Sequence, residues 1–184
     1  MPDRPGVAVT RADEDAAPLV TALEDVGLRA VRTPLLRVAL ASPDELANIL
    51  ATEAPFDWLV CTSRHGVEAL AAACQVRGVS PRDLGIAQVG AVGRRTAEAL
   101  EAIGVRVDLV PDIADALHLA EAMLARAEGR AGRVLFPRAR EAREALPTAL
   151  RDAGWAVVDV ACYDTLPRAE GGAQLADALA QGAV

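Results

Sequence analysis

Three short segments combine arginine, glycine and small hydroxyl side chains at the point where a predicted strand gives way to a predicted helix. They are TSRHG (62–66), VGAVGRRT (89–96) and FPRAREAR (136–143). A helix N-terminus carries roughly half a positive charge on its unpaired backbone N–H groups, and a guanidinium adds a forked pair of donors. The three segments therefore predict a site for carboxylate or phosphate groups.

Each segment also has a purely structural interpretation. Ser63 could simply cap its helix, Gly90 and Gly93 could only permit tight turns, and the arginines could be solvated. VGAVGRRT does not fit a dinucleotide-binding fingerprint, because the second and third glycines of that motif would fall at Val92 and Arg95.

Tyr163 is the only tyrosine of the chain and stands in CYDTLP, at the end of a predicted strand. Its ring could pack between segments while its hydroxyl meets water. Beside an acidic ligand, the phenol could instead donate a hydrogen bond or a proton. The residues alone leave both interpretations open.

All 19 basic residues are arginine, and this absence of lysine excludes several classes of protein. Without lysine there is no Walker-type phosphate loop and no Schiff base to pyridoxal phosphate or a carbonyl substrate. The net charge of −7 argues against nucleic acid as the main partner. An acidic small molecule is still compatible with this charge where arginines gather locally.

The chain of 184 residues is 52% hydrophobic and 24% charged, which predicts an ordered protein. We find no signal-peptide core and no apolar run of membrane-spanning length, so we expect a soluble, cytoplasmic protein without a membrane partner. Cys61, Cys74 and Cys162 show no CxxC spacing, and the chain has only two histidines. A metal site is therefore not expected, and the cysteines are predicted to be packing residues.

Strand and helix patterns alternate along the whole chain. Strands are predicted at 6–11, 30–40, 56–62, 85–90, 105–110, 132–139 and 155–163. Helices are predicted at 14–27, 43–53, 64–77, 91–103, from about 114, 141–153 and 173–180. This order predicts an α/β fold with parallel sheets, whose ligands bind at the carboxyl ends of the strands. The chain stops where a further strand is expected, so we expect it to be cut short.

The order of these segments resembles the uroporphyrinogen-III synthase family, whose members cyclise hydroxymethylbilane in tetrapyrrole (haem) synthesis. The matching segments are VAVTR (7–11), LVCTSRHGVEAL (59–70), IAQVGAVGRRTAEAL (86–100) and RVLFPRAREAREALPTALRDAGWAVVDVACYDT (133–165). The resemblance covers nearly the whole chain in register, although no single motif is highly specific.

This resemblance implies two flavodoxin-like α/β domains with parallel sheets, joined by two extended connectors. Residues 1–35 and 165–184 would form domain one, and residues 36–164 would form domain two. The family's chain continues beyond Val184, so domain one is expected to be discontinuous and incomplete.

The resemblance also implies roles for particular residues. Thr62, Ser63 and Arg64 match the family's cleft turn of domain two, Thr96 matches a cleft hydroxyl, and Tyr163 matches the tyrosine proposed as general acid. The candidate substrate-binding residues are Arg11, Thr62, Ser63, Arg64, Gly66, Gly90, Thr96 and Arg138, with Tyr163 as candidate catalytic residue.

The implied activity is that of a cyclising hydro-lyase, which removes the hydroxyl of hydroxymethylbilane as water and inverts ring D to give uroporphyrinogen III. Because the bilane also closes spontaneously to the wrong isomer, the main task of such an enzyme is to hold one conformation. The resemblance implies no cofactor and no metal, a polycarboxylate small molecule as the partner, and a monomer.

Two other classes of function stay open at this point. A non-catalytic tetrapyrrole-binding or regulatory domain of the same fold would keep the arginine-containing turns. A receiver-like signalling domain would need an acidic cluster at the strand ends and a lysine, and both Cys61-Thr62 and the absence of lysine count against it.

Overall fold

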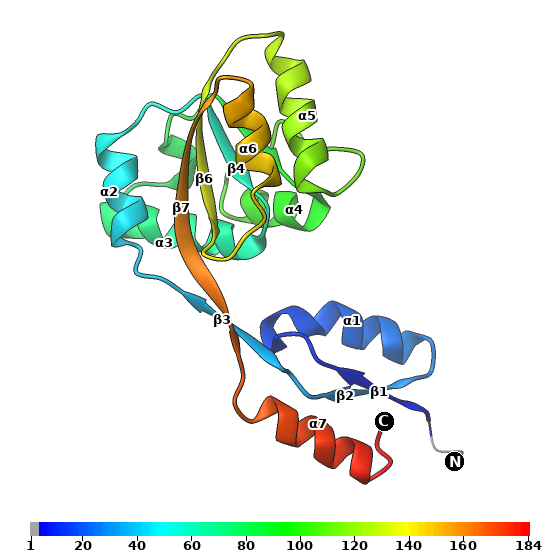
Figure 1. Ribbon diagram of the computed structural model, residues 1–184. Coiled ribbons are helices and arrows are strands. Elements are labelled where there is room, and N and C mark those ends of the chain that lie inside the picture. Colours follow the sequence, from blue (N-terminus) through cyan, green and yellow to red (C-terminus); the bar gives the residue numbers. More distant parts are fainter. Residues whose placement is uncertain (1–3) are drawn as a thin grey trace. The chain divides into compact units, whose positions relative to one another are not determined.

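The computed structural model describes residues 4–184 and divides into two compact units (Figure 1). The first unit comprises Met1–Ala39 together with Thr165–Val184, and the second comprises Leu40–Asp164. Two strands, β3 (Leu36–Leu40) and β7 (Ala156–Pro167), carry the chain across the boundaries of these units. Within residues 4–184, every helix is too short or too polar to cross a lipid bilayer.

The first unit contains a parallel pair of strands, β1 (Gly6–Val9) and β2 (Arg29–Arg32). Helix α1 (Asp13–Asp25) packs against both strands, and α7 (Gly171–Ala180) completes the unit. The predicted extended segment 30–40 is interrupted around Pro34, where β2 has ended and β3 has not begun. Proline supplies no backbone N–H to a strand ladder, which accounts for this break.

A five-stranded sheet runs in the order β3-β7-β6-β4-β5, and its strands β4, β5 and β6 lie wholly within the second unit. Its remaining strands are β4 (Trp58–Cys61), β5 (Gln88–Ala91) and β6 (Arg133–Ala139), and β4 pairs in parallel with both β5 and β6. β6 also pairs in parallel with β7. The predicted α/β class with parallel sheets is confirmed.

Helices form two groups around this sheet. α3 (Arg64–Arg77) packs against α2 (Asp44–Thr52) and α4 (Arg94–Ala102), whereas α5 (Ala116–Ala127) packs against α6 (Ala145–Asp152) (Figure 1). From β4 the chain moves outward to β5, and from β6 it moves outward to β7 on the other side. The strand order therefore reverses between β4 and β6, which is where parallel sheets bind ligands.

The buried core of the second unit is largely aliphatic and includes two tryptophan rings whose centroids are 6.3 Å apart. Its fully packed members include Trp58, Val60, Leu119, Met123, Phe136, Leu146, Leu150 and Trp155. These side chains come from both strands and helices, so the core fixes α5 and α6 against the sheet.

The strand predicted at 105–110 is wrong, because only Leu109 forms an isolated bridge, to Gly90 of β5. The Asp108 carboxylate accepts a hydrogen bond of 3.0 Å from the backbone N–H of Val89. This side chain takes a donor that a regular ladder would give to a backbone carbonyl. Despite its alternating pattern, VRVDLV (105–110) therefore joins β5 through a single bridge and a side-chain contact rather than as a strand.

Candidate functional site

The carboxyl ends of β4, β5, β6 and β7 share one edge of the second unit's sheet, because these strands are parallel. Each of the three predicted anion-binding turns begins at this edge. The turn after β4 opens α3, the turn after β5 opens α4, and the turn after β6 leads to α6. The edge includes the point between β4 and β6 where the strand order reverses.

The turn after β4 is fixed by a side-chain cap and by a close backbone approach. Ser63 is the N-cap of α3, and its Oγ accepts a hydrogen bond of 3.0 Å from the backbone N–H of His65. A Cβ added to Gly66 would lie 2.8 Å from the backbone oxygen of Pro137, so the start of α3 lies directly against β6. Ser63 and Gly66 therefore both have structural roles at this edge.

Charged groups on the first two turns of α3 form a small cluster. The Nδ1 atom of His65 lies 3.0 Å from a carboxylate oxygen of Glu68, and Arg64 reaches the same carboxylate at 3.5 Å. His65 is only 6% exposed, which is unusual for a polar residue in the first turn of a helix. We did not single out His65 from the sequence, although its spacing of three residues from Glu68 was visible there.

Tyr163 lies beside this turn. Its ring is 5.4 Å from that of His65 at an interplanar angle of 53°, and the residue is 8% exposed. Its backbone oxygen accepts a hydrogen bond from the N–H of Arg140, which anchors the segment after β6. The structure thus brings the predicted acid into contact with the predicted carboxylate-holding turn.

A pocket of about 300 Å³ lies at the same edge, close to the point of strand reversal. Thr62 follows β4, Val92 follows β5, and Phe136 belongs to β6, while Asp115 and Arg143 come from the segments before α5 and α6. No ion pair or hydrogen bond engages the exposed side chain of Arg143 within residues 4–184. The sequence placed Arg143 in an arginine-rich turn, and the structure shows that it lines the pocket.

Asp115 at the rim of this pocket caps α5. Its carboxylate accepts hydrogen bonds from the backbone N–H groups of Leu117, at 2.8 Å, and His118, at 3.4 Å. The bond from Leu117 is the main reason that the pKa of Asp115 is lowered, and the His118 ring adds to it. The carboxylate is therefore held in its ionised form next to Arg143's pocket.

Arg138 differs from the other predicted binding residues, because it is 5% exposed and its guanidinium is engaged inside the unit. It donates to Asp159 at 2.9 Å, to the backbone oxygen of Ala142 at 2.8 Å and to Glu144 at 2.5 Å. The hydrogen bond from Arg138 lowers the pKa of Glu144. For Asp159, burial acts to raise the pKa, but Arg151 and Arg138 outweigh it and the pKa is lowered.

Arg138 of β6 therefore links β7, through Asp159, to the segment that carries Arg143, through Ala142 and Glu144; we call this set of contacts the Arg138 clamp. A role in substrate binding stays a prediction for Arg138, whose buried Nε is the guanidinium nitrogen left without a hydrogen bond. The sequence did not reveal the clamp, because its partners Asp159 and Glu144 lie on separate elements.

The remaining predicted residues are dispersed. Gly90 lies inside β5, where an added Cβ would touch the Leu119 side chain at 3.4 Å, so its place is in the core. Thr96 is buried in the first turn of α4. Arg11 is exposed and follows β1 at the carboxyl end of the first unit's strands. For these three residues, substrate binding stays a prediction.

The cysteines are free and buried. Burial raises the pKa of Cys61 to about 12 and that of Cys162 to about 11, and it also raises the pKa of Cys74. Protonated thiols of this kind are poor nucleophiles, in keeping with their predicted packing role. Within residues 4–184, no cluster of three or more His, Cys, Asp or Glu side chains is arranged to hold a metal ion.

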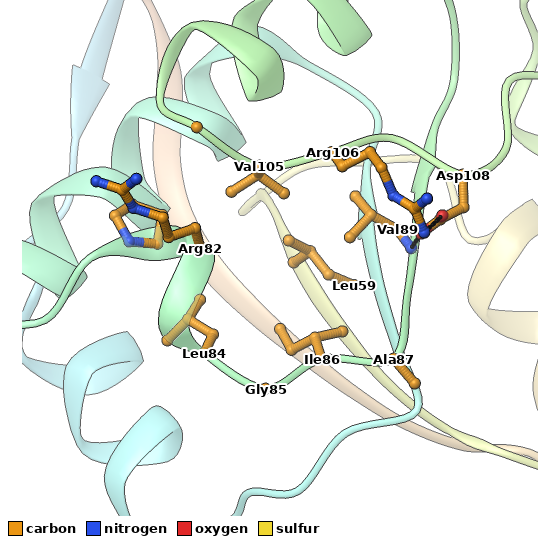
Figure 2. Close-up of a pocket in the computed structure, with 12 residues that line it drawn as sticks. Leu59, Arg82, Leu84, Gly85, Ile86, Ala87, Val89, Val105, Arg106 and Asp108 are labelled. Carbon is orange, nitrogen blue, oxygen red and sulfur yellow. Dashed lines mark hydrogen bonds and ion pairs between the residues drawn. The ribbon is translucent and has the colours of Figure 1, made fainter.

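A second hollow, of about 200 Å³, lies away from the strand carboxyl ends (Figure 2). Leu59, Val89 and Val105 line it together with the segment that precedes β5. Arg106 at its margin forms an ion pair of 2.6 Å with Asp108. Arg82 also lines this hollow and donates a hydrogen bond of 3.1 Å to the Ser80 hydroxyl.

The second unit is thus a doubly wound α/β unit with arginines and helix N-termini at the carboxyl edge of its sheet, the edge at which such units bind their ligands. The family model of uroporphyrinogen-III synthase HemD matches residues 17–184. The chain therefore belongs to the uroporphyrinogen-III synthase family. This confirms the family predicted from the sequence.

Individual relatives agree with this assignment. The chain is 33% identical over 182 residues to a putative uroporphyrinogen-III synthase of Methanothermobacter thermautotrophicus, covering 97% of this chain and 70% of the relative. It is 30% identical over 115 residues to the porphyrin biosynthesis protein HemD of Ruminiclostridium josui, covering 62% of this chain and only 23% of that protein.

A crystal structure of a mutant uroporphyrinogen III synthase from the extremely thermophilic bacterium Thermus thermophilus has the same fold. The TM-score is 0.69 at 22% identity, and the match covers 97% of this chain and 69% of that one. This chain thus spans between about a quarter and about 70% of the length of these three proteins.

We predict that Arg138→Met lowers the free energy of unfolding at pH 7 by about 1–3 kcal/mol, through loss of hydrogen bonds to Asp159 and the Ala142 carbonyl. Carboxyl groups whose pKa is lowered in the folded state stabilise it above their unfolded pKa, and this contribution disappears as the pH falls through the folded pKa. Urea unfolding measured from about pH 6 down to 3 should therefore depend less steeply on pH in the variant.

Arg94→Met is the matched control, because Arg94 forms an exposed pair with Glu98 on α4. It should change the unfolding free energy by no more than about 0.5 kcal/mol and leave the pH dependence intact. An Arg138→Met protein with the wild-type pH dependence would contradict the clamp.

Proposed function

We propose that this chain carries the activity of its family: it cyclises hydroxymethylbilane, with loss of water and inversion of ring D, to uroporphyrinogen III. The observation that supports this most is the contact between Tyr163 and the turn that contains His65. The ring centroids of Tyr163 and His65 are 5.4 Å apart. A candidate acid and a candidate carboxylate-holding turn, far apart in the sequence, meet at the edge where such sheets bind ligands.

The two compact units are proposed to correspond to the two domains implied by the resemblance, residues 1–35 with 165–184 and residues 36–164. In the second, the backbone N–H groups at the start of α3 and the guanidinium of Arg143 would hold carboxylates of the bilane. Arg11 would add a charge from the first domain. We further propose a cytoplasmic monomer that needs no cofactor and has no nucleic-acid or membrane partner.

In the proposed reaction, the phenol of Tyr163 gives its proton to the departing hydroxyl of the bilane, which leaves as water with the electron pair of the C–O bond. The azafulvene cation that remains is attacked by the substituted carbon of ring D, which gives a spiro intermediate. This intermediate fragments and recloses with ring D inverted, and the proton lost in the last step restores the phenol. Holding one conformation throughout is the task of the surrounding carboxylate contacts.

The direct test is to generate hydroxymethylbilane in situ, add the protein, oxidise the products and separate uroporphyrin isomers I and III by chromatography. The proposal predicts an excess of isomer III over the spontaneous reaction. Isomer I alone, with tight binding of uroporphyrin retained, would identify a non-catalytic tetrapyrrole-binding protein of the same fold instead.

Tyr163→Phe should lower kcat by on the order of tenfold to a hundredfold, because it removes the proton donor. Binding of uroporphyrinogen III should change by less than about twofold, because the buried ring is kept. Rapid-quench kinetics and a product-binding titration measure the two quantities. A variant with the wild-type kcat would remove Tyr163 from the mechanism.

Arg143→Gln should raise KM by roughly tenfold with a smaller effect on kcat, because it removes one charge-assisted contact to a substrate carboxylate. Arg130→Gln is the matched control: Arg130 is exposed and precedes β6, at the amino end of the sheet. Steady-state kinetics should show wild-type behaviour for this control. Equal KM values for the two variants would contradict the role of Arg143.

A further inference from the structure

His65 is a buried histidine that the reaction described above does not use. Its side chain lies in the first turn of α3, between the cap residue Ser63 and the close-packed Gly66. A buried polar ring is costly unless its nitrogen atoms have hydrogen-bond partners. The position of His65, at the carboxyl edge and next to the candidate acid, calls for a more specific explanation than packing.

Glu68 holds one end of the imidazole. The distance of 3.0 Å from Nδ1 of His65 to the Glu68 carboxylate is that of a hydrogen bond, and it places the proton on Nδ1 in the neutral ring as well as in the imidazolium. A guanidinium nitrogen of Arg64 lies 3.5 Å from the other oxygen of the same carboxylate. The imidazole is therefore held to its own helix by the hydrogen bond between His65 and Glu68, which are three residues apart.

The imidazole of His65 also contacts the ring of Tyr163, at a centroid distance of 5.4 Å and an interplanar angle of 53°, within the range of favourable tilted aromatic pairs. Tyr163 follows an irregularity in β7, where Arg138 pairs with Ala161 but Ala139 pairs with Tyr163. A β-bulge of this kind changes the direction of the side chains that follow it, and such bulges are frequent beside active sites.

We propose that His65 is a positioning residue for Tyr163: held by Glu68, the imidazole fixes the direction of the phenol ring at the candidate site. Transfer of a proton to a departing hydroxyl depends on this direction, and a displacement of about 1 Å can cost orders of magnitude in rate. The expected effect of His65 on kcat rests on the proposed function, whereas its contact with the Tyr163 ring does not. The contact between the two rings has a readout of its own.

Tyr163 is the only tyrosine of this chain, so the NMR signals of isotopically labelled tyrosine report on one ring, and Tyr163→Phe verifies their assignment. In His65→Leu the Tyr163 ring signals should move from their wild-type positions. Glu68→Leu should move them in the same direction by a smaller amount. His118→Leu is the matched control, because His118 is the other histidine and also pairs with an acid three residues away, Asp115.

Kinetics then separates positioning from a direct role. His65→Leu should lower kcat by on the order of tenfold with KM changed by less than about twofold. Introduced into Tyr163→Phe, the same substitution should change kcat by less than about twofold, because it acts through the missing hydroxyl. Circular dichroism and thermal unfolding confirm that each variant is folded, and His65→Gln serves in place of His65→Leu if the latter is not.

Unchanged Tyr163 signals in a folded His65 variant would overturn the proposal, whatever its activity. An equal loss of kcat with and without the Tyr163 hydroxyl would overturn it too, since His65 would then act independently of Tyr163. If the wild-type protein makes no isomer III, the proposed function fails, and the NMR comparison alone still decides whether His65 positions the ring.

Discussion

The first turn of α3 lies so close to the backbone of β6 that position 66 has room for glycine alone, with the oxygen of Pro137 2.8 Å from where a Cβ would be. α3 follows β4, which is the neighbour of β6 in the sheet, so this contact lies beside the point where the strand order reverses. Because α3 starts there, its N-terminal turn, with His65 and Glu68, lies at the carboxyl edge of the sheet. The contact with Tyr163 on β7 depends on the same approach.

Arg138 and Arg143 of the second unit differ in burial and in the side chains that surround them. Arg138 is buried with two acidic partners and a carbonyl, and a buried guanidinium needs such partners to offset its lost hydration. Arg143 is exposed at a pocket of about 300 Å³ and keeps its hydration until a ligand arrives. An exposed arginine such as Arg143 is available to bind a polyanionic ligand. The buried Arg138 instead fixes the segment that carries Arg143.

The sequence predicted the fold class and the three turns because parallel α/β order alone brings strand carboxyl ends to one edge. It could not separate Arg138 from Arg143, since both lie in FPRAREAR and the carboxylates that engage Arg138, those of Asp159 and Glu144, come close to it only in the folded chain. Gly90 was ambiguous for a related reason, because a glycine inside a strand and one in a turn share the same local pattern. The pairing of His65 with Tyr163 needs the register between β6 and β7, which local periodicity does not contain.

The buried thiols have a practical consequence. With pKa values of about 12 for Cys61 and about 11 for Cys162, almost no thiolate exists at neutral pH, and Cys74 is buried with a raised pKa as well. A maleimide dye will therefore react slowly with the native cysteines and quickly with one introduced on the surface. Single-site fluorescent labelling of this protein requires no cysteine-free background.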